Sequence, residues 1–170
     1  VRAAGSVQTS TGCTIGITTT NILGVSTAGL NVGDLVDNQN FIAGTKIATI
    51  GVGSIFADRD STNTASSPGN SVKFLGVTTA YSSASSVKSI IIGGTFANNT
   101  NNQVSLSVVV EDNSTGTDVA LASKIPVPAG SSFVISDTGK TLLEGDYKVK
   151  IYVDANSAID VSLSILTGVN

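Results

Sequence analysis

Hydrophobic residues alternate with small polar residues along much of this chain, in short runs separated by glycine, asparagine, aspartate and serine. Alternation with a period of two is typical of a β-strand that buries one face. In residues 147–153 two sets of side chains share one face each: Tyr147, Val149, Ile151 and Val153, and opposite them Lys148, Lys150 and Tyr152. This segment predicts a half-buried strand with a solvated face. No window of a dozen residues has helical apolar spacing with good helix formers and without glycine. We therefore expect an all-β protein.

The second half of the chain carries further runs of this kind. The apolar run Val87–Ile92, with Ile90-Ile91-Ile92, predicts a central strand covered on both faces, and alternating strands are expected at 104–110, 119–127, 133–135 and 159–165. About six or seven strands at this spacing are typical of an antiparallel β-sandwich, either immunoglobulin-like or jelly-roll-like. Pro126 and Pro128 each lack a backbone N–H donor, so we expect their strand to lie at a sheet edge. Tyr147 is interpreted as a core or edge aromatic residue.

Breaks in these patterns suggest two parts. We predict a small β-rich N-terminal region at residues 1–76, a linker rich in serine and threonine at 77–86, and a C-terminal sandwich at 87–170. A long polar loop is expected at Ala57–Asn70. The segment Val1–Thr11, expected to be flexible, and the C-terminal "LTGVN" could each add a strand to the sheet of a neighbouring subunit.

The composition excludes many kinds of chemistry. The chain has no histidine and one cysteine, so Ser-His-Asp and Cys-His catalysis, histidine-containing zinc and iron sites and thiolate clusters are excluded. No phosphate-binding or dinucleotide-binding glycine motif is present. Cys13 cannot form an internal disulfide, and its apolar setting in "TGCTIGI" predicts a core position. We expect no catalytic residue, no cofactor and no metal site, and predict that the protein is not an enzyme.

Charge also limits the partners. The net charge is −3 and the pI is about 4.6, and the basic residues are scattered, so no nucleic acid or membrane partner is expected. No apolar run approaches the roughly 18 residues that span a bilayer, and Val1–Gly5 lacks the apolar core of a signal peptide. Only 12% of the residues are charged. A surface of hydroxyls and amides suits burial against partner subunits, although a soluble monomer is the alternative.

Two clusters of polar residues are candidate binding sites. Asp58-Arg59-Asp60 could bind a cation or a partner, but ion pairing within a solvated loop is the favoured interpretation. Glu111, Asp112, Asn113 and Asp118 offer the oxygen ligands that calcium takes. Their spacing does not match an EF-hand loop, so a surface turn is favoured there.

Two further patterns do not indicate a site. Glu111 and Glu144 are the only glutamates, so a glycosidase with paired carboxylates would need an aspartate partner. Asn98 and Asn113 stand in Asn-X-Thr triplets, which are glycosylated only in a eukaryotic secretory pathway. Nothing else in the chain points to that setting.

Two long segments resemble proteins of bacterial viruses. "GLNVGDLVDNQNFIAGTKIATIGVGSIFADRDSTNT", residues 29–64, is similar to a β repeat of phage tail-fibre and virion surface proteins with the pattern GLxVGxxV…IxxGTxIxxI. "IPVPAGSSFVISDTGKTLLEGDYKVKIYVDANSAIDVSLSIL", residues 125–166, resembles the C-terminal segment of small structural proteins of tailed marine phages, cyanophages in particular. The chain differs from long fibre proteins because it is short, has one copy of the first pattern and lacks collagen-like or coiled-coil segments.

This resemblance implies a structural role on a virion. We expect a decoration or cement subunit on the capsid surface that bridges subunits of the major capsid protein and associates with itself, with a trimer as the first expectation. The alternative is a tail, neck or fibre component that recognises a host surface receptor. An enzyme acting on cell-surface polysaccharide is a second alternative, which the aromatic content of 5% disfavours.

Overall fold

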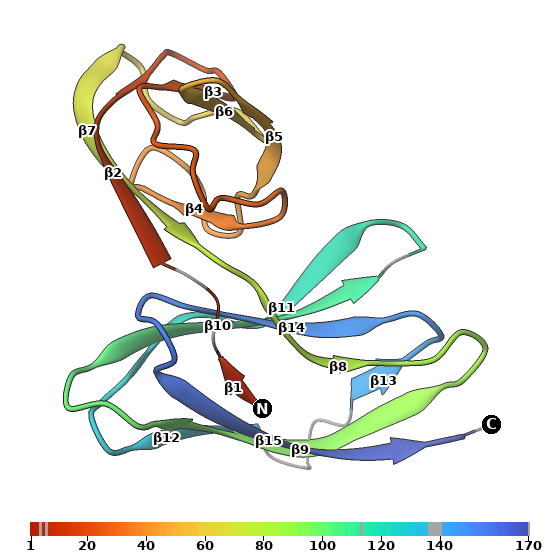
Figure 1. Cartoon of the computed structure of the whole chain (residues 1–170). Coiled ribbons are helices and arrows are strands. Elements are labelled where there is room, and N and C mark those ends of the chain that lie inside the picture. Colours follow the sequence, from red (N-terminus) through yellow and green to blue (C-terminus); the bar gives the residue numbers. More distant parts are fainter. Residues whose placement is uncertain (4, 6, 113, 136–140, 170) are drawn as a thin grey trace. The chain divides into compact units, whose positions relative to one another are not determined.

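A computed structural model describes residues 1–3, 5, 7–112, 114–135 and 141–169. The regular structure in these residues consists of β-strands and no helix, so the prediction of an all-β protein is confirmed. The chain forms two compact units. Unit 1 comprises Val1–Gly5 and Thr78–Asn170, and unit 2 comprises Ser6–Val77. Both are visible in Figure 1.

The structure differs from the predicted division at both ends of unit 2. The N-terminal residues belong to unit 1, because β1 (Arg2–Ala3) pairs with β15 (Ile159–Thr167). The expected linker at 77–86 contains a paired strand, because β8 (Thr78–Ser82) is hydrogen-bonded to β14 (Lys148–Val153). In sequence, unit 2 is therefore an insertion between the first and second strands of unit 1.

Unit 1 is an antiparallel β-sandwich. In one sheet the order is β1, β15, β9 (Ser89–Asn98) and β12 (Ser132–Ile135), and β13 (Thr141–Leu143) also pairs with β9. In the other the order is β11 (Thr117–Val127), β10 (Val104–Asp112), β14 and β8. The sandwich prediction is confirmed, because side chains of both sheets form one core. An immunoglobulin-like or jelly-roll-like type stays a prediction.

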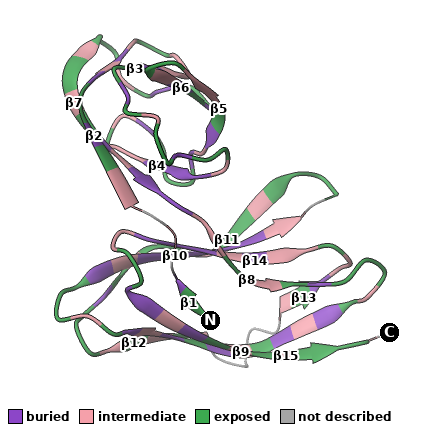
Figure 2. Cartoon of the chain, in the orientation of Figure 1, coloured by how far each residue is buried: buried purple, intermediate pink, exposed green. Residues whose placement is uncertain are grey.

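The core of unit 1 is built from the alternating faces that the sequence indicated. Figure 2 shows buried positions on both sheets. The core side chains are Ala3, Ile91, Phe96, Val104, Leu106, Val108, Val110, Ala122, Val127, Leu143, Val149, Ile151, Val153, Ala158, Ile159 and Val161. The rings of Phe96 and Phe133 pack in a tilted arrangement, with centroids 5.9 Å apart and planes at 38°. Each of these aromatic side chains comes from a strand of the five-stranded sheet.

The prediction of a solvated outer face on β14 is wrong. Tyr152 is 1% exposed, and the Lys150 side chain is 16% exposed. Strand β14 lies between β10 and β8, so neighbouring side chains flank its outer face on both sides. Glu111 of β10 forms ion pairs with both Lys148 and Lys150. Tyr147, just before the strand, packs against the core as expected.

The prediction that residues 87–92 are covered on both faces is also wrong. Strand β9 is central in its sheet, and Ile91 is buried beneath it. Ile90 is only partly buried, however, and Ile92 is 37% exposed. A two-layer sandwich covers one face of each sheet, so alternate residues of a central strand remain on the outside.

The edge position of the proline-containing strand is confirmed. Within the part of the chain that the structure describes, strand β11 pairs with β10 alone, and Pro126 lies opposite Ser105. Pro128 follows the strand and accepts a hydrogen bond from the backbone nitrogen of Ser131 through its carbonyl oxygen. Proline has no N–H to leave unpaired at an edge, which explains its position here.

Unit 2 is a six-stranded antiparallel sheet that closes on itself. Its order is β4 (Leu35–Asp37), β7 (Ser67–Leu75), β2 (Val7–Ile15), β3 (Asn21–Leu23), β6 (Ser54–Ala57) and β5 (Ile47–Gly51). A bridge between Leu35 and Lys46 joins the two ends of this order. The enclosed side chains are Cys13, Ile15, Ile22, Val25, Leu30, Val36, Phe41, Ile47, Ile55, Ala57, Val72 and Phe74. Cys13 thus occupies the predicted core position.

Two loop predictions in this unit need correction. The segment expected to be flexible up to Thr11 is strand from Val7 onward, because β2 pairs with both β3 and β7. The polar loop expected at 57–70 is shorter, because β6 includes Ala57 and β7 begins at Ser67. Within that loop the buried Ser61 donates a hydrogen bond from Oγ to the carbonyl oxygen of Gly16.

Replacement of Asn98 by alanine should destabilise unit 1 by about 1–3 kcal/mol, because it leaves buried acceptors without donors. The buried Asn98 Nδ2 lies 2.7 Å from the carbonyl oxygen of Asn102, 2.9 Å from that of Val127 and 3.1 Å from that of Pro128. Denaturant unfolding measures the loss. The exposed Asn101 provides the control, since Asn101→Ala should change little. Equal stability of the two variants would contradict this role of Asn98.

Asp34 should make the stability of unit 2 depend on pH. It is 2% exposed at the closure of the sheet, and its Oδ2 accepts a hydrogen bond of 2.8 Å from the backbone nitrogen of Asn31. Burial raises the pKa of this carboxyl above its ordinary value. The contribution of Asp34 to the stability of unit 2 is therefore fully present below the unfolded pKa of about 3.9. It is lost as the pH rises through the raised pKa of the folded state.

Asp34→Asn keeps an acceptor oxygen without the charge. As the pH rises above about 3.9, the unfolding free energy of the wild type should fall relative to that of Asp34→Asn. Chemical denaturation at a series of pH values measures this difference. Asp37→Asn in the neighbouring strand is the control, and parallel curves for wild type and Asp34→Asn would contradict the assignment.

Candidate interaction site

The outer edge of β15 is partly open. Along one side this strand pairs with β9 from Ile159 to Thr167. On the other side β1 covers only its first residues, with Ala3 opposite Ile159 and Arg2 opposite Asp160. Among the described residues no strand pairs with the remaining edge, Ser162–Thr167. We call these six positions the open edge of β15.

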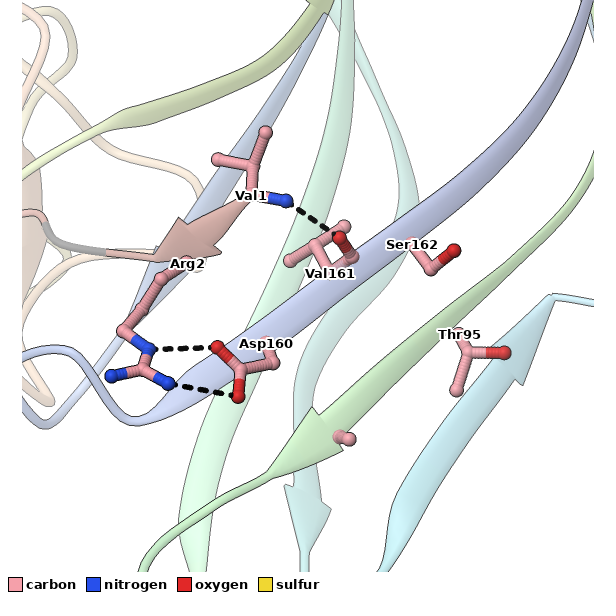
Figure 3. Close-up of a pocket in the computed structure, with 7 residues that line it drawn as sticks. Val1, Arg2, Thr95, Asp160, Val161 and Ser162 are labelled. Atoms are coloured by element: carbon pink, nitrogen blue, oxygen red, sulfur yellow. Dashed lines mark hydrogen bonds and ion pairs between the residues drawn. The ribbon is translucent and has the colours of Figure 1, made fainter.

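Strand β1 is held in place by main-chain and side-chain bonds, which Figure 3 shows in part. The backbone nitrogen of Val1 donates to the carbonyl oxygen of Val161 at 2.8 Å, and the nitrogen of Val161 donates to the carbonyl oxygen of Val1 at 2.6 Å. The guanidinium of Arg2 binds both carboxylate oxygens of Asp160, with Nε 2.7 Å from Oδ1 and Nη2 3.1 Å from Oδ2. Two-point geometry of this kind fixes orientation as well as distance.

The ion pair perturbs both partners. The hydrogen bond from Arg2 lowers the pKa of Asp160 below its ordinary value, and the amide of Asn99, at 3.2 Å, acts in the same direction. The same hydrogen bond raises the pKa of Arg2. The side chains are 58% and 45% exposed, so water and salt screen the attraction.

A shallow hollow of about 470 Å³ lies beside this ion pair, on the outer face of the five-stranded sheet. It is lined by Val1, Arg2, Thr95, Ala97, Asp160, Val161 and Ser162. Its two charges neutralise each other, and its other polar side chains are the hydroxyls of Thr95 and Ser162. These two hydroxyls could form hydrogen bonds with uncharged groups of a partner.

The outer face of the same sheet carries a row of apolar side chains. Leu142, Ile90 and Leu166 lie opposite one another on β13, β9 and β15, and Ile92 occupies a register shift beside them. Leu142 and Leu166 are each 50% exposed. We call Ile90, Ile92, Leu142 and Leu166 the outer apolar cluster. Its signal in the sequence is Ile90-Ile91-Ile92, a pattern that also predicts a strand covered on both faces.

The acidic loop of unit 2 shows the local pairing that the sequence favoured. Arg59 Nη2 lies 3.2 Å from Asp58 Oδ2. Asp58 also accepts a 2.9 Å hydrogen bond from the backbone nitrogen of Lys46. Asp60 is exposed. Asp58 and Arg59 therefore form a contact within the loop, and Asp58 also joins the loop to the backbone of Lys46.

The acidic residues near the β10–β11 turn do not converge. Glu111 binds Lys148 and Lys150, whereas Asp112 accepts hydrogen bonds from Ser114 and Thr115 within the turn. These hydroxyls hold the pKa of Asp112 below its ordinary range. Asp118 lies opposite Glu111 in the register, and Asn113 is outside the described residues.

The remaining candidates have structural partners. Glu144 Oε1 lies 3.3 Å from Lys88 Nζ. The amide nitrogen of Asn98, the atom that glycosylation would modify, lies within hydrogen-bond distance of three carbonyl oxygens that its two hydrogens serve. In the described residues no group of three or more Cys, Asp or Glu side chains is placed to hold a metal ion. The described residues also contain no helix that could span a membrane.

No protein-family model, no curated protein and no solved structure matches this chain.

Arg2→Gln should loosen β1, because it removes the charge that holds Asp160. Hydrogen exchange followed by NMR should show a faster exchange of the Val161 amide, which donates to Val1. In the wild type the same loosening should appear as the pH falls below about 3.9, since a carboxylate with a lowered pKa stabilises only while it is ionised. Arg59→Gln is the control. Unchanged Val161 exchange in Arg2→Gln would contradict this role of the ion pair.

Proposed function

We propose that this protein is a non-enzymatic structural component of a phage virion that binds the capsid surface as a decoration or cement subunit. Its partners are the major capsid protein and further copies of itself. Each copy bridges neighbouring capsid subunits and adds buried area at their joints. The resemblance of residues 29–64 and 125–166 to virion proteins suggests this setting.

The outer apolar cluster is the observation that carries the proposal. Four aliphatic side chains from three strands lie together on a sheet face that the sandwich core leaves uncovered. Contiguous apolar side chains at a surface are typical of a contact with another macromolecule. Covering Leu142 and Leu166 would remove the most apolar area from water, because each of them is half exposed.

The low charge of the chain supports the same use. Only 12% of its residues are charged, and the four members of the outer apolar cluster are uncharged, so a contact at the cluster requires little desolvation of ions. Weak contacts suffice when many copies bind one particle and each copy touches more than one subunit, because the second contact forms at a high effective concentration.

Binding to expanded capsids tests the proposal. The purified chain should bind at stoichiometric ratios in co-sedimentation, and Ile92→Ser with Leu142→Ser should weaken binding about tenfold or more, since two aliphatic contacts are lost. Val119→Ser on β11, 59% exposed in the wild type, is the matched control. Wild-type chain that stays in the supernatant would overturn the capsid assignment.

The number of copies per virion separates this role from its alternative. Quantitative gel densitometry should give a copy number comparable with that of the capsid protein. A copy number as low as that of tail or neck proteins would overturn decoration and favour a receptor-binding component instead.

A further inference from the structure

We infer that the outer face of unit 2 around Phe56 binds a neutral saccharide, with the aromatic ring as the surface on which one pyranose ring stacks. The site lies on the neighbouring strands β3, β6 and β5. This inference goes beyond the proposed function, because it concerns unit 2 of the free protein and requires no capsid.

The ring of Phe56 lies on the outside of unit 2, in the middle of three strands. Strand β6 pairs with β3 on one side and with β5 on the other. Ile55 and Ala57 point into the core, so the alternation of the strand directs Phe56 outward, where it is 42% exposed. The other four phenylalanines of the chain lie in or against the two cores. Phe56 therefore differs from them in having no packing role there.

Polar, uncharged side chains flank this ring on both sides. Asn21 of β3 and Thr49 of β5 lie directly opposite Phe56 in the register. Directly opposed residues share one face of a sheet, with Cβ atoms about 4.5–5.5 Å apart. On the same face, two positions before Phe56, Ser54 lies opposite Leu23. The aromatic ring thus stands between an amide and a hydroxyl.

The amide of Asn21 differs from the other side-chain amides of asparagine in unit 2. Its Oδ1 is buried and accepts no hydrogen bond from the described residues. In the other asparagines of this unit the amide nitrogen donates to an oxygen of the same unit; these are Asn31, Asn38, Asn40, Asn63 and Asn70. Rotation of the amide exchanges its oxygen and its nitrogen. A sugar hydroxyl can pair with either atom, because it both donates and accepts.

The strands under the ring are held together on both sides of it. The carbonyl oxygen of Gly53 accepts hydrogen bonds from the backbone nitrogens of Gly24, at 2.9 Å, and Val25, at 3.0 Å. The backbone nitrogen of Ala57 donates to the carbonyl oxygen of Thr20 at 2.8 Å. Strand β6 is therefore tied to the segment around β3 before and after the ring. A surface that is ordered before binding loses little conformational freedom when a ligand binds.

These groups match the chemistry of a neutral pyranose. The C–H groups on one face of such a ring suit the negative face of an aromatic ring, and the hydroxyls at its rim can reach the flanking amide and hydroxyl. A few directed polar groups beside an apolar surface are typical of small-molecule sites. Two residues beyond Phe56, the carboxylate of Asp58 is paired with Arg59 Nη2 at 3.2 Å. The face therefore suits a neutral sugar better than an acidic one.

An NMR titration of the backbone amides tests binding, with cellotriose and lactose as probes. The shifts should be confined to residues of β3, β5 and β6. The dissociation constant should be on the order of 1 mM, because the surface is open and one ring supplies the stacking. The corresponding glucuronic acid trimer should bind at least tenfold more weakly than cellotriose. If neither neutral probe shifts an amide of these strands at ten times that concentration, the inference is overturned.

Two substitutions of Phe56 separate stacking from simple apolar contact. Phe56→Tyr keeps an aromatic ring and should bind cellotriose within about twofold of the wild type. Phe56→Leu keeps an apolar side chain without the ring and should bind at least tenfold more weakly. Val32→Ser, at a position of unit 2 that is 63% exposed, is the control and should bind as the wild type does. Unchanged binding by Phe56→Leu would overturn the stacking.

Asn21→Ala tests the amide. It should weaken cellotriose binding about fivefold, the effect of losing one neutral hydrogen bond. It should not lower stability in denaturant unfolding, because the amide oxygen has no partner among the described residues. Asn38→Ala should lower stability, since Asn38 Nδ2 donates to the carbonyl oxygen of Ser71. Unchanged sugar binding by Asn21→Ala would overturn the role of the amide.

The same variants keep this site distinct from the proposed capsid contact. Phe56→Leu should co-sediment with capsids as the wild type does. Ile92→Ser with Leu142→Ser should bind cellotriose normally. Loss of capsid binding by Phe56→Leu, in a chain that binds neither neutral probe, would overturn the inference in favour of a protein contact at this face. Failure of sugar binding and failure of capsid binding therefore remain distinguishable.

Discussion

Every N–H and C=O group at a sheet edge must find a partner or face water, and this constraint organises the whole chain. Unit 2 satisfies it by closing its sheet between Leu35 and Lys46. Unit 1 meets this constraint in a different way at each sheet edge. Proline and charged residues occupy β11, whereas the two-residue β1 covers one end of β15. In the described residues β8, β12 and β13 each have one edge that pairs with no strand, as does Ser162–Thr167 of β15.

Strand β1 also determines how the chain is organised. Because Arg2 and Ala3 pair with a strand near the C-terminus, unit 2 becomes an insertion within unit 1. A two-residue strand contributes few main-chain bonds, so its side chains matter more than usual. The two-point contact of Arg2 with Asp160 supplies orientation, although the exposure of both groups limits its strength.

The sequence predicted what depends on local alternation. The core faces of β10, β14 and β15, the buried Cys13 and the edge position of Pro126 all follow from the pattern or from the chemistry of one residue. The sequence did not reveal β1 or β8, because two residues have no period and Thr78–Ser82 lacks apolar alternation. These strands are defined by partners far away in the chain.

Alternation assigns residues to faces but does not say what covers each face. For this reason Tyr152 was expected in solvent and is buried, whereas Ile92 was expected to be covered and is exposed. The same ambiguity applies to the outer apolar cluster, because three consecutive isoleucines are compatible both with a strand covered on two faces and with a strand that exposes one apolar face.

The outer apolar cluster and the ion pair of Arg2 with Asp160 belong to the same sheet but differ in chemistry. Leu142 and Leu166 are each 50% exposed, so covering them removes apolar area from water. Arg2 and Asp160 are also exposed, and water and salt screen their attraction. A contact at the cluster therefore depends on buried apolar area, whereas the attachment of β1 depends on charge. Substitutions at Leu142 and at Arg2 can separate the two.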